Sequence, residues 1–437
     1  MRKQVKEKIM ETLLKLEQKQ IKIARAVSEG RGEEARSLLA ECQETAILIG
    51  NTVEADETGH PSVIRRLEEY CELLYRQSMA AEEGVFHGEL DASLAIIKEA
   101  VNTQIAGKLE VVFFPYKASM WDSLESVYEA AERDGECDAY VVPIPYFDKN
   151  PDGTVSGFHY EGDGFPNEIP IVHWEAYDVA ARRPDIIYIH NPYDQANKVT
   201  SVHPDYYAKE LRKHTKRLVY IPYFVCLNDC VQKELCVLPG TMYADRVIVQ
   251  SEKTREVYIE EFHKFEDEYN CRGRFGSAEE KFVALGSPKY DKVVRTAKEG
   301  TSLPGNWEKK IKKPDGGRRK VLLYNTSLVQ LLNGKEKCLE KIEAVLALLR
   351  GREDVTLLWR PHPLSGTTYD AMQPELSARY RRIVENYKKE DWGIYDDTPD
   401  LHRAIAVSDA YYGDMSSLVE LYRMTGKPIL IQNVETP

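Results

Sequence analysis

The sequence predicts an α/β fold in which two doubly wound, Rossmann-like domains follow an all-helical N-terminal segment. From Leu109 onward, short apolar runs alternate with helical stretches, a pattern typical of parallel sheets covered on both faces. A stretch rich in Gly, Pro, Asn and Lys at residues 298–320 interrupts the alternation, which then restarts. At 437 residues the chain is also too long for one core. We therefore expect a helical part at 1–106, α/β domains at 107–297 and 321–437, and a linker at 298–320.

The first 106 residues carry apolar side chains at helical spacing. The four stripes contain Val5, Ile9, Leu13 and Leu16; Ala35, Leu38, Cys42, Ala46, Ile49 and Val53; Ile64, Leu67, Cys71 and Leu74; and Leu90, Leu94, Ile97 and Val101. Turn residues separate the stripes at 29–33 and 56–61. Four amphipathic helices on short loops favour an antiparallel bundle. Because the segment carries no cluster of ligand-binding residues, we expect it to serve docking or homo-oligomerisation.

The first α/β domain is expected to begin with a buried strand at 109–116. Ser119 and Asp122 then have the spacing of a capping box at the start of a helix. Further strands are predicted at 139–144, 185–190, 217–221, 246–250 and 282–285. Residues 147–170 are rich in Gly, Asp, Pro and Asn, which predicts an ordered insertion or a mobile lid.

The second α/β domain repeats the alternation after the linker. Strands are predicted at 320–324, 355–360, 393–396, 410–412 and 428–431, and helices at 339–349, 376–387, 400–406 and 417–423. Two such domains with a ligand between them form the architecture of GT-B glycosyltransferases. That fold normally adds closing helices after its last strand, so a chain ending at Pro437 is expected to be either a trimmed version or a fragment.

Composition excludes some functions and leaves others open. A net charge of −12 argues against sequence-independent nucleic-acid binding, which needs a basic surface. The N-terminus has no apolar core of signal-peptide length and no run reaches membrane-spanning length, so a cytoplasmic protein is expected. The basic runs at 309–313 and 318–320 fit either a solvated linker or peripheral contact with an anionic membrane surface. Cys226, Cys230 and Cys236 match no common zinc spacing, so reduced thiols are expected.

Polar clusters follow three predicted strands of the second domain. They are Asn325, Thr326 and Ser327; Arg360, Pro361 and His362; and Asp414, Ser416, Ser417 and Glu420. Because the carboxyl ends of parallel strands meet at one edge of a sheet, these clusters can form one anion-binding crevice. An Arg clamp, a His donor, serine hydroxyls at a helix start and a carboxylate for ribose hydroxyls are the groups that a nucleotide diphosphate needs. Taken alone, each also fits a structural role as a turn or a helix cap.

The order of these motifs resembles the CDP-glycerol glycerophosphotransferase family of teichoic-acid-type polymer synthesis. The matching residues are Arg360 and His362; Ser408, Asp409, Asp414, Ser416, Ser417 and Glu420; and Gly426-Lys-Pro-Ile429. Weaker similarity extends to 245–251 and 285–291. The resemblance implies a GT-B fold and a metal-independent, cofactor-free transferase. Such an enzyme moves glycerol phosphate or ribitol phosphate from a CDP-alcohol to a hydroxyl on a glycan or lipid-linked acceptor. By position, Arg360, His362, Ser416, Ser417 and Glu420 would hold the diphosphate and ribose of the donor.

One part of the family pattern is absent. A Trp-His-Gly segment usually supplies the general base, but the corresponding stretch here reads Tyr220-Ile-Pro-Tyr-Phe-Val225. The nearest candidate base is His190, oriented by Asp194; a His-Asn-Pro turn without a catalytic role is the alternative. Two other functions stay open: a sugar-nucleotide glycosyltransferase or UDP-sugar 2-epimerase on the same fold, and a degenerate transferase that serves as a partner-binding module.

Overall fold

The computed structural model describes residues 1–56, 59–80, 88–150, 152–398 and 400–432. The chain forms two compact units, residues 1–111 with 131–139, and residues 112–130 with 140–437. In the described residues, no helix is long and apolar enough to cross a membrane. Residues 57–58 of the predicted second turn and the chain end at 433–437 lie outside this description.

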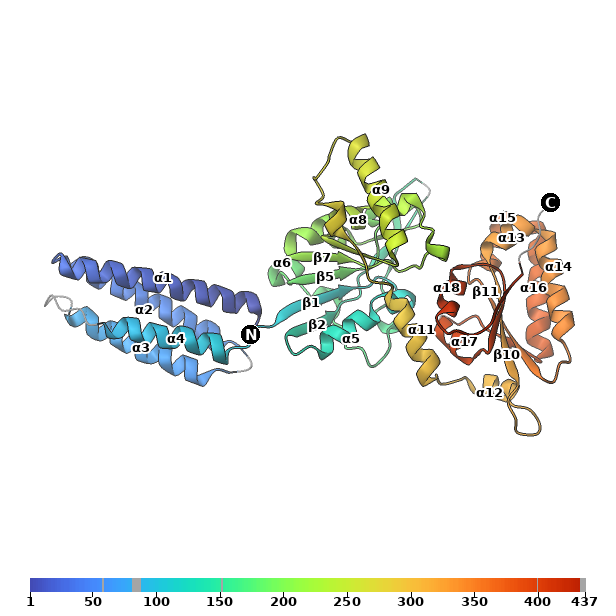
Figure 1. The fold of residues 1–437 in the computed structure, drawn as a ribbon, viewed down its shortest axis with the longest axis horizontal. Helices are drawn as coiled ribbons and strands as arrows, with labels where there is room; N and C mark the ends of the chain where they lie inside the picture. The colour runs from blue at the N-terminus through green and yellow to red at the C-terminus, as the bar shows by residue number, and fades with distance from the viewer. Residues whose placement is uncertain (57–58, 81–87, 151, 399, 433–437) are drawn as a thin grey trace. The chain divides into compact units, whose positions relative to one another are not determined.

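The N-terminal unit contains the predicted helices, α1 (Lys3–Ser28), α2 (Gly32–Glu54), α3 (Pro61–Ala80) and α4 (Glu89–Gln104) (Figure 1). Each helix packs against its sequence neighbour, and α1 also packs against α4. The predicted stripes are largely buried, although Leu39 and Val63 take the core positions expected for Leu38 and Ile64. This core also contains a buried hydrogen bond between two helices: the Gln20 amide of α1 donates to the Tyr70 hydroxyl of α3 over 2.7 Å.

The second unit contains two parallel sheets, and Figure 1 labels most of their strands. The first has the order β2-β1-β5-β7-β8-β9, with β1 (Leu109–Phe114), β2 (Cys137–Val141), β5 (Ile186–Ile189), β7 (Arg217–Tyr220), β8 (Arg246–Val249) and β9 (Phe282–Ala284); β1 and β2 are shared with the first unit. Its α-helices are α5 (Glu125–Arg133), α6 (Val179–Arg182), α7 (Ala208–Leu211), α8 (Pro239–Tyr243), α9 (Glu252–Glu268) and α10 (Ala278–Lys281). We call this part the N-domain.

The second sheet has the order β12-β11-β10-β13-β14, and all its pairs are parallel. Its strands are β10 (Lys320–Thr326), β11 (Val355–Pro361), β12 (Ile394–Tyr395), β13 (Ala410–Gly413) and β14 (Ile429–Ile431). Its helices are α13 (Leu328–Gly334), α14 (Glu336–Leu349), α15 (Ser365–Met372), α16 (Pro374–Glu390), α17 (Leu401–Val407) and α18 (Ser417–Arg423). We call this part the C-domain. The predicted fold class, two Rossmann-like domains behind a helical N-terminal segment, is confirmed.

Two regions contain more regular structure than the sequence indicated. The stretch at 298–320 contains the end of α11 (Pro288–Glu299) and all of α12 (Gly305–Ile311). Trp307 and Ile311 are buried there, so α12 packs rather than acting as a structureless linker. In the predicted insertion at 147–170, of which residue 151 lies outside the described residues, β3 (Tyr146–Lys149) and β4 (Val155–His159) form an antiparallel sheet of order β4-β3-β6 with β6 (Thr200–Val202), which comes later in the chain.

The strand order fixes where a ligand would bind in each sheet. In the C-domain the chain runs from β10 to β11 and β12 on one side, and then returns to β13 on the other side of β10. In the N-domain the equivalent reversal lies between β1 and β5. Ligands of open α/β sheets bind beyond the carboxyl ends of the strands at such a switch point. The loops after β10 and β13 are therefore the first place to look.

Candidate functional site

Asn325 joins the loops that follow β10, β11 and β13. Its amide nitrogen donates to the main-chain oxygen of Arg360 over 2.9 Å. Its amide oxygen accepts from the Ser416 hydroxyl over 3.1 Å and from the Tyr411 hydroxyl over 3.2 Å. The side chain is almost completely buried. Because of these bonds, the Arg-x-His segment and the Ser-Ser segment, far apart in sequence, form one continuous edge of the sheet.

Gly413 allows the β13 loop to lie directly against β10. Its φ of +136° is a conformation that side chains rarely adopt, and a Cβ there would lie 2.2 Å from the main-chain oxygen of Asn325. No other residue fits between the strands without moving the backbone. This close approach brings Ser416 within reach of Asn325.

Asp414 is fully buried and links the loops that follow β10 and β14, the second of them through Lys341. One carboxylate oxygen accepts from the main-chain N–H of Ser327 over 2.7 Å, and the other pairs with the ammonium of Lys341. Lys341 also donates to the main-chain oxygen of Gln432 over 3.0 Å. Both oxygens of Asp414 are therefore engaged, and we correct its expected role from donor binding to support of the loop. Sequence reasoning missed Lys341, although a lysine interrupts the apolar stripe of α14 at this point.

The hydroxyls of Thr326 and Ser327 also have structural partners. The Thr326 hydroxyl oxygen accepts from the Trp359 indole N–H over 3.3 Å. The Ser327 hydroxyl accepts from the main-chain N–H of Gln330 over 3.3 Å and caps α13. The alternative of an ordinary polar turn, left open by the sequence, fits these two side chains better than direct donor binding does.

The side chain of His362 is exposed at the edge. Its main-chain N–H donates to the oxygen of Thr326 over 3.0 Å, and its Nδ1 accepts from the Leu364 N–H over 3.2 Å. The neutral ring therefore carries its proton on Nε2. Desolvation by neighbouring atoms lowers the pKa of the imidazole. Near pH 7 the ring can donate a hydrogen bond from Nε2 to an anionic oxygen.

Arg360 is buried and fixed by groups at the end of β12. Its guanidinium pairs with the Asp396 carboxylate and donates to the Thr398 oxygen over 2.9 Å. Two of its five N–H groups are involved in these two bonds, and Asp396 compensates part of its charge. We therefore correct the expected role of Arg360. Its guanidinium is held in place by Asp396 and Thr398 and is not free to clamp a phosphate. Pro361 is the last residue of β11 and lies opposite Thr326 of β10; that it keeps the loop stiff stays a prediction.

A cleft of about 330 Å³ opens beside Arg360 and His362. Its walls come from the ends of β11 and β12 and from α15 and α16, and include Tyr380, Arg381, Tyr395 and Thr398. This volume lies at the lower end of the range of roughly 300–1,000 Å³ for small-molecule pockets. Two aromatic rings together with Arg and His are suitable for a base and a phosphate. Sequence reasoning missed Tyr380 and Tyr395, because both look like packing residues of their elements.

The Ser-Ser segment lies at the start of α18, as predicted. Ser416 occupies the N-cap position but gives its hydroxyl to Asn325, and Ser417 is exposed. Glu420 already has two partners, since its carboxylate accepts from the Asn228 N–H over 2.7 Å and from Arg423 over 2.6 Å. A ribose would have to share or displace these donors.

His190 has no accessible nitrogen. The ring is completely buried, its Nε2 accepts from the Tyr116 N–H over 3.1 Å, and its Nδ1 lies 3.0 Å from the Ser123 hydroxyl. Burial lowers its pKa to about 3. Asp194 does not orient it, because both carboxylate oxygens accept from the Ala208 N–H. We therefore correct both expected roles: His190 is a structural residue and not the general base, and Asp194 is a structural residue that does not orient it.

The depressed pKa of His190 has a measurable consequence for stability. The unfolded histidine binds a proton below about pH 6.5, whereas the folded one does not until about pH 3. The unfolded state therefore binds more protons in this window, and stability is lost as the pH falls. His190→Gln should remove this contribution, so the stability advantage of the wild type should shrink by about 1.4 kcal/mol for each pH unit below 6.5. Urea unfolding of both proteins at pH 7.5, 6 and 5 measures it; a constant difference would contradict it.

The sequence did not reveal a buried charged cluster formed by Asp122, Lys289 and His402. One oxygen of Asp122 accepts from Lys289 over 2.6 Å, and the other lies 2.8 Å from His402 Nε2. Burial raises the pKa of Asp122, but Lys289 and His402 outweigh it and lower the pKa to about 2. The predicted capping role of Asp122 is therefore wrong, because its carboxylate binds side chains of α11 and α17 instead.

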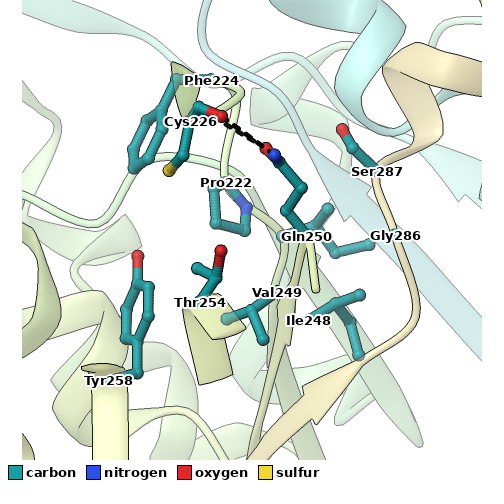
Figure 2. A pocket seen from close by; sticks show the side chains of 11 residues that line it. Pro222, Phe224, Cys226, Ile248, Val249, Gln250, Thr254, Tyr258, Gly286 and Ser287 are labelled. Carbon is teal, nitrogen blue, oxygen red and sulfur yellow. Dashed lines mark hydrogen bonds between the residues drawn. The ribbon is translucent and has the colours of Figure 1, made fainter. Parts of the chain in front are cut away.

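The loop after β7 in the N-domain covers a small cavity rather than a ligand site (Figure 2). Gln250 holds this loop by hydrogen bonds of 2.7 and 2.9 Å to the main chain of Cys226. The cavity measures about 10 Å³, which is space for roughly one water molecule. Such a water could bind the Tyr258 hydroxyl, which is buried and lacks a partner among the described residues.

Cysteines and acidic residues give no sign of a metal site in the described part of the chain. No group of three or more His, Cys, Asp or Glu side chains there is arranged to hold a metal ion. Cys226 and Cys236 are buried free thiols and Cys230 is an exposed one. Burial raises the pKa of Cys226 and of Cys236 to about 12, so both stay protonated near neutral pH.

Among known proteins, the chain matches solved structures only. No family model matches the chain, and no curated protein matches it. The UDP-GlcNAc 2-epimerase of Neisseria meningitidis, solved with UDP-GlcNAc, is 9% identical, with 75% of this chain and 84% of that chain covered and a TM-score of 0.43. The enzyme of the same name from Methanocaldococcus jannaschii is 10% identical, with 74% and 83% covered and a TM-score of 0.44. The wall teichoic acid polymerase TagF is 15% identical, with 86% and 78% covered and a TM-score of 0.39.

Proposed function

We propose that the protein transfers glycerol phosphate, or a related polyol phosphate, from a CDP-alcohol to a hydroxyl of a glycan or lipid-linked acceptor. The observation that carries this proposal is the edge joined by Asn325, which places His362 and Ser416 on neighbouring loops at the switch point of the C-domain. The adjacent cleft of about 330 Å³ has Tyr and Arg side chains that suit a nucleoside phosphate, with the carboxylates of Glu385, Asp396 and Asp397 also on its walls. The choice of a CDP-alcohol rests on the motif resemblance.

In the proposed reaction, the acceptor hydroxyl oxygen attacks the phosphorus that bears the polyol. The bond from that phosphorus to the bridging oxygen of the diphosphate breaks, and CMP leaves with the bond electrons. Nε2–H of His362 and the exposed hydroxyl of Ser417 donate to the leaving phosphate, where negative charge develops; the Ser416 hydroxyl holds the loop through Asn325. Such transfers depend mainly on positioning and charge stabilisation, and the acceptor proton passes to solvent once the new bond has formed.

A thermal-shift comparison of CDP-glycerol, UDP-GlcNAc and GDP-mannose tests the donor assignment. A ligand at one hundred times its Kd stabilises the folded protein by about 2.7 kcal/mol. We expect CDP-glycerol to raise the melting temperature, and the other two compounds at equal concentration to leave it unchanged. A shift with UDP-GlcNAc alone would instead favour a sugar-nucleotide glycosyltransferase or epimerase.

The burial of His190 gives a reason to keep a non-catalytic function in view. A partner-binding module derived from a transferase could keep the donor edge while having no base on the acceptor side. In that case no nucleotide would be turned over, and none would bind at millimolar concentration if the donor edge were also inactive. Release of CMP from CDP-glycerol in the presence of an acceptor would exclude this alternative.

A further inference from the structure

Six aromatic rings form a continuous strip on the antiparallel insertion of the N-domain. In order they are Phe158, Phe147, His203, Trp174, His173 and Tyr160, and we call them the aromatic strip. Successive ring centroids are 5.7, 5.9, 5.8, 6.1 and 4.8 Å apart. Phe147 lies on β3 and Phe158 on β4, Tyr160 directly follows β4, and His203 directly follows β6. His173 and Trp174 belong to the turn at 173–176. Pairing of the three strands and packing of the turn hold the rings together. Six rings in successive contact form a larger aromatic surface than a single exposed side chain does.

The aromatic strip is exposed at Phe158 and His173, whereas Trp174 is partly buried and packs with part of its surface against the N-domain core. Phe158 is 56% exposed, and the side chains of His173 and His203 keep 50% and 27% of their surface. Nδ1 of each of these histidines accepts a main-chain N–H two residues on, at 3.4 Å. The proton of the neutral ring therefore lies on Nε2, where it can be donated to a hydroxyl. The strip thus offers both apolar ring surface and hydrogen-bond donors.

The charge around the strip selects against anionic partners. Residues 146–178 contain seven carboxylates and a single lysine: Asp148, Asp152, Glu161, Asp163, Glu168, Glu175 and Asp178 against Lys149. An acidic surface repels anionic lipid headgroups and nucleic acids. Carboxylates do accept hydrogen bonds from neutral hydroxyls. An uncharged, hydroxyl-rich molecule with apolar faces, which is the chemistry of a saccharide, fits both properties of this surface.

The insertion that carries the aromatic strip packs against the switch point of the N-domain through buried rings on the other face of β3. Tyr146, next to Phe147, packs edge-on against Tyr116 with centroids 5.4 Å apart. Tyr116 in turn packs against the ring of His190 at the end of β5, with centroids 5.5 Å apart. The Tyr146 hydroxyl donates to Glu161 over 2.6 Å, and Glu161 accepts from the Ala118 N–H, which ties the insertion to the loop after β1.

We propose that the aromatic strip binds the uncharged saccharide portion of the acceptor by stacking sugar rings on Phe158 and Trp174. The sugar C–H faces contact the aromatic rings, while their hydroxyls bond to the histidine Nε2–H groups and the nearby carboxylates. The assignment of this saccharide as the acceptor rests on the proposed transferase function. The binding of a saccharide to the strip does not depend on the donor.

The test is binding of chitohexaose, maltohexaose and cellohexaose to the full chain, measured by isothermal titration calorimetry and saturation-transfer NMR. We expect at least one hexasaccharide to bind, and Phe158→Ala and Trp174→Ala each to weaken its binding at least tenfold. Tyr269→Ala is the matched control, because Tyr269 is 62% exposed and stacks on Phe265 of α9, outside the strip. This control should bind like the wild type.

The proposal would be overturned if no hexasaccharide binds, or if both strip variants bind as the wild type does. Sedimentation with phosphatidylcholine vesicles that is lost in Trp174→Ala, without saccharide binding, would assign the strip to a membrane surface and likewise refute it. Thermal shift with CDP-glycerol separates this proposal from the proposed function. If a saccharide binds but CDP-glycerol does not raise the melting temperature, the transferase proposal is refuted and the saccharide site stands. If CDP-glycerol raises the melting temperature but no saccharide binds, the saccharide site is refuted and the transferase proposal stands.

Discussion

Replacing Asp414 with alanine is expected to destabilise the C-domain by about 3–5 kcal/mol, the cost of leaving one member of a buried ion pair without its partner. Asp414 is fully buried, and its removal leaves the Lys341 ammonium and the Ser327 N–H without their acceptor. The loops that carry Ser327 and Ser416 should loosen together, so nucleotide binding should be lost as well. Urea unfolding followed by circular dichroism measures the first effect, and a thermal shift with CDP-glycerol the second.

Two further variants distinguish loss of the buried pair from loss of any acidic side chain. Asp267→Ala removes an exposed carboxylate of α9 whose ion pair with Arg272 should contribute about 0–1 kcal/mol, and serves as the matched control. Replacing both partners by apolar residues, as Lys341→Met with Asp414→Leu, should recover much of the stability lost in Asp414→Ala. A cost below about 1 kcal/mol for Asp414→Ala would show that the pair does not hold the loops.

Replacing His362 with alanine is expected to lower nucleotide release from CDP-glycerol by about 10²–10³-fold while leaving the fold intact. The expected size is that of removing one hydrogen-bond donor from developing negative charge. The side chain is exposed, so its loss should change stability little. His263→Ala is the matched control, since His263 lies on α9 with Glu266 and Glu279 as partners. Turnover unchanged in His362→Ala would exclude its role.

The same side chain predicts how donor affinity depends on pH. Desolvation lowers the pKa of His362 from its ordinary value of 6.5, so the free protein holds a neutral ring at pH 7. A diphosphate binds the imidazolium better than the neutral ring. Affinity for CDP-glycerol should therefore rise as the pH falls through the pKa of His362, and this rise should be absent in His362→Ala. Titration calorimetry at pH 5.5, 6.5 and 7.5 compares the two proteins.

The architecture could be predicted because local signals and tertiary packing agree. The strands at 320–324 and 410–412 lie within β10 and β13, and α18 spans the expected residues 417–423. The insertion was harder to assign, because its strands are short and contain Asp148 and Gly157, residue types that are uncommon in strands. Helix α12 was missed because its lysines and glycine hide two buried positions, Trp307 and Ile311.

The site was predicted as a location, and less well as a set of roles. The sequence placed Asn325, His362 and Ser416 at one edge, since parallel strands end together. It could not show that Asp414 pairs with Lys341 or Arg360 with Asp396, because those partners are set by packing between distant segments. The burial of His190 was equally inaccessible, because a histidine at a strand end can point into the core or away from it.

A crystal structure of the protein with CDP-glycerol tests the central claim most directly. We expect the diphosphate at the edge formed by the loops after β10, β11 and β13, with phosphate oxygens within about 3 Å of His362 Nε2 and of the Ser416 or Ser417 hydroxyl. The cytosine ring is expected in the cleft beside Tyr380 and Tyr395. A diphosphate bound away from this edge, or no bound nucleotide at saturating concentration, would contradict the claim.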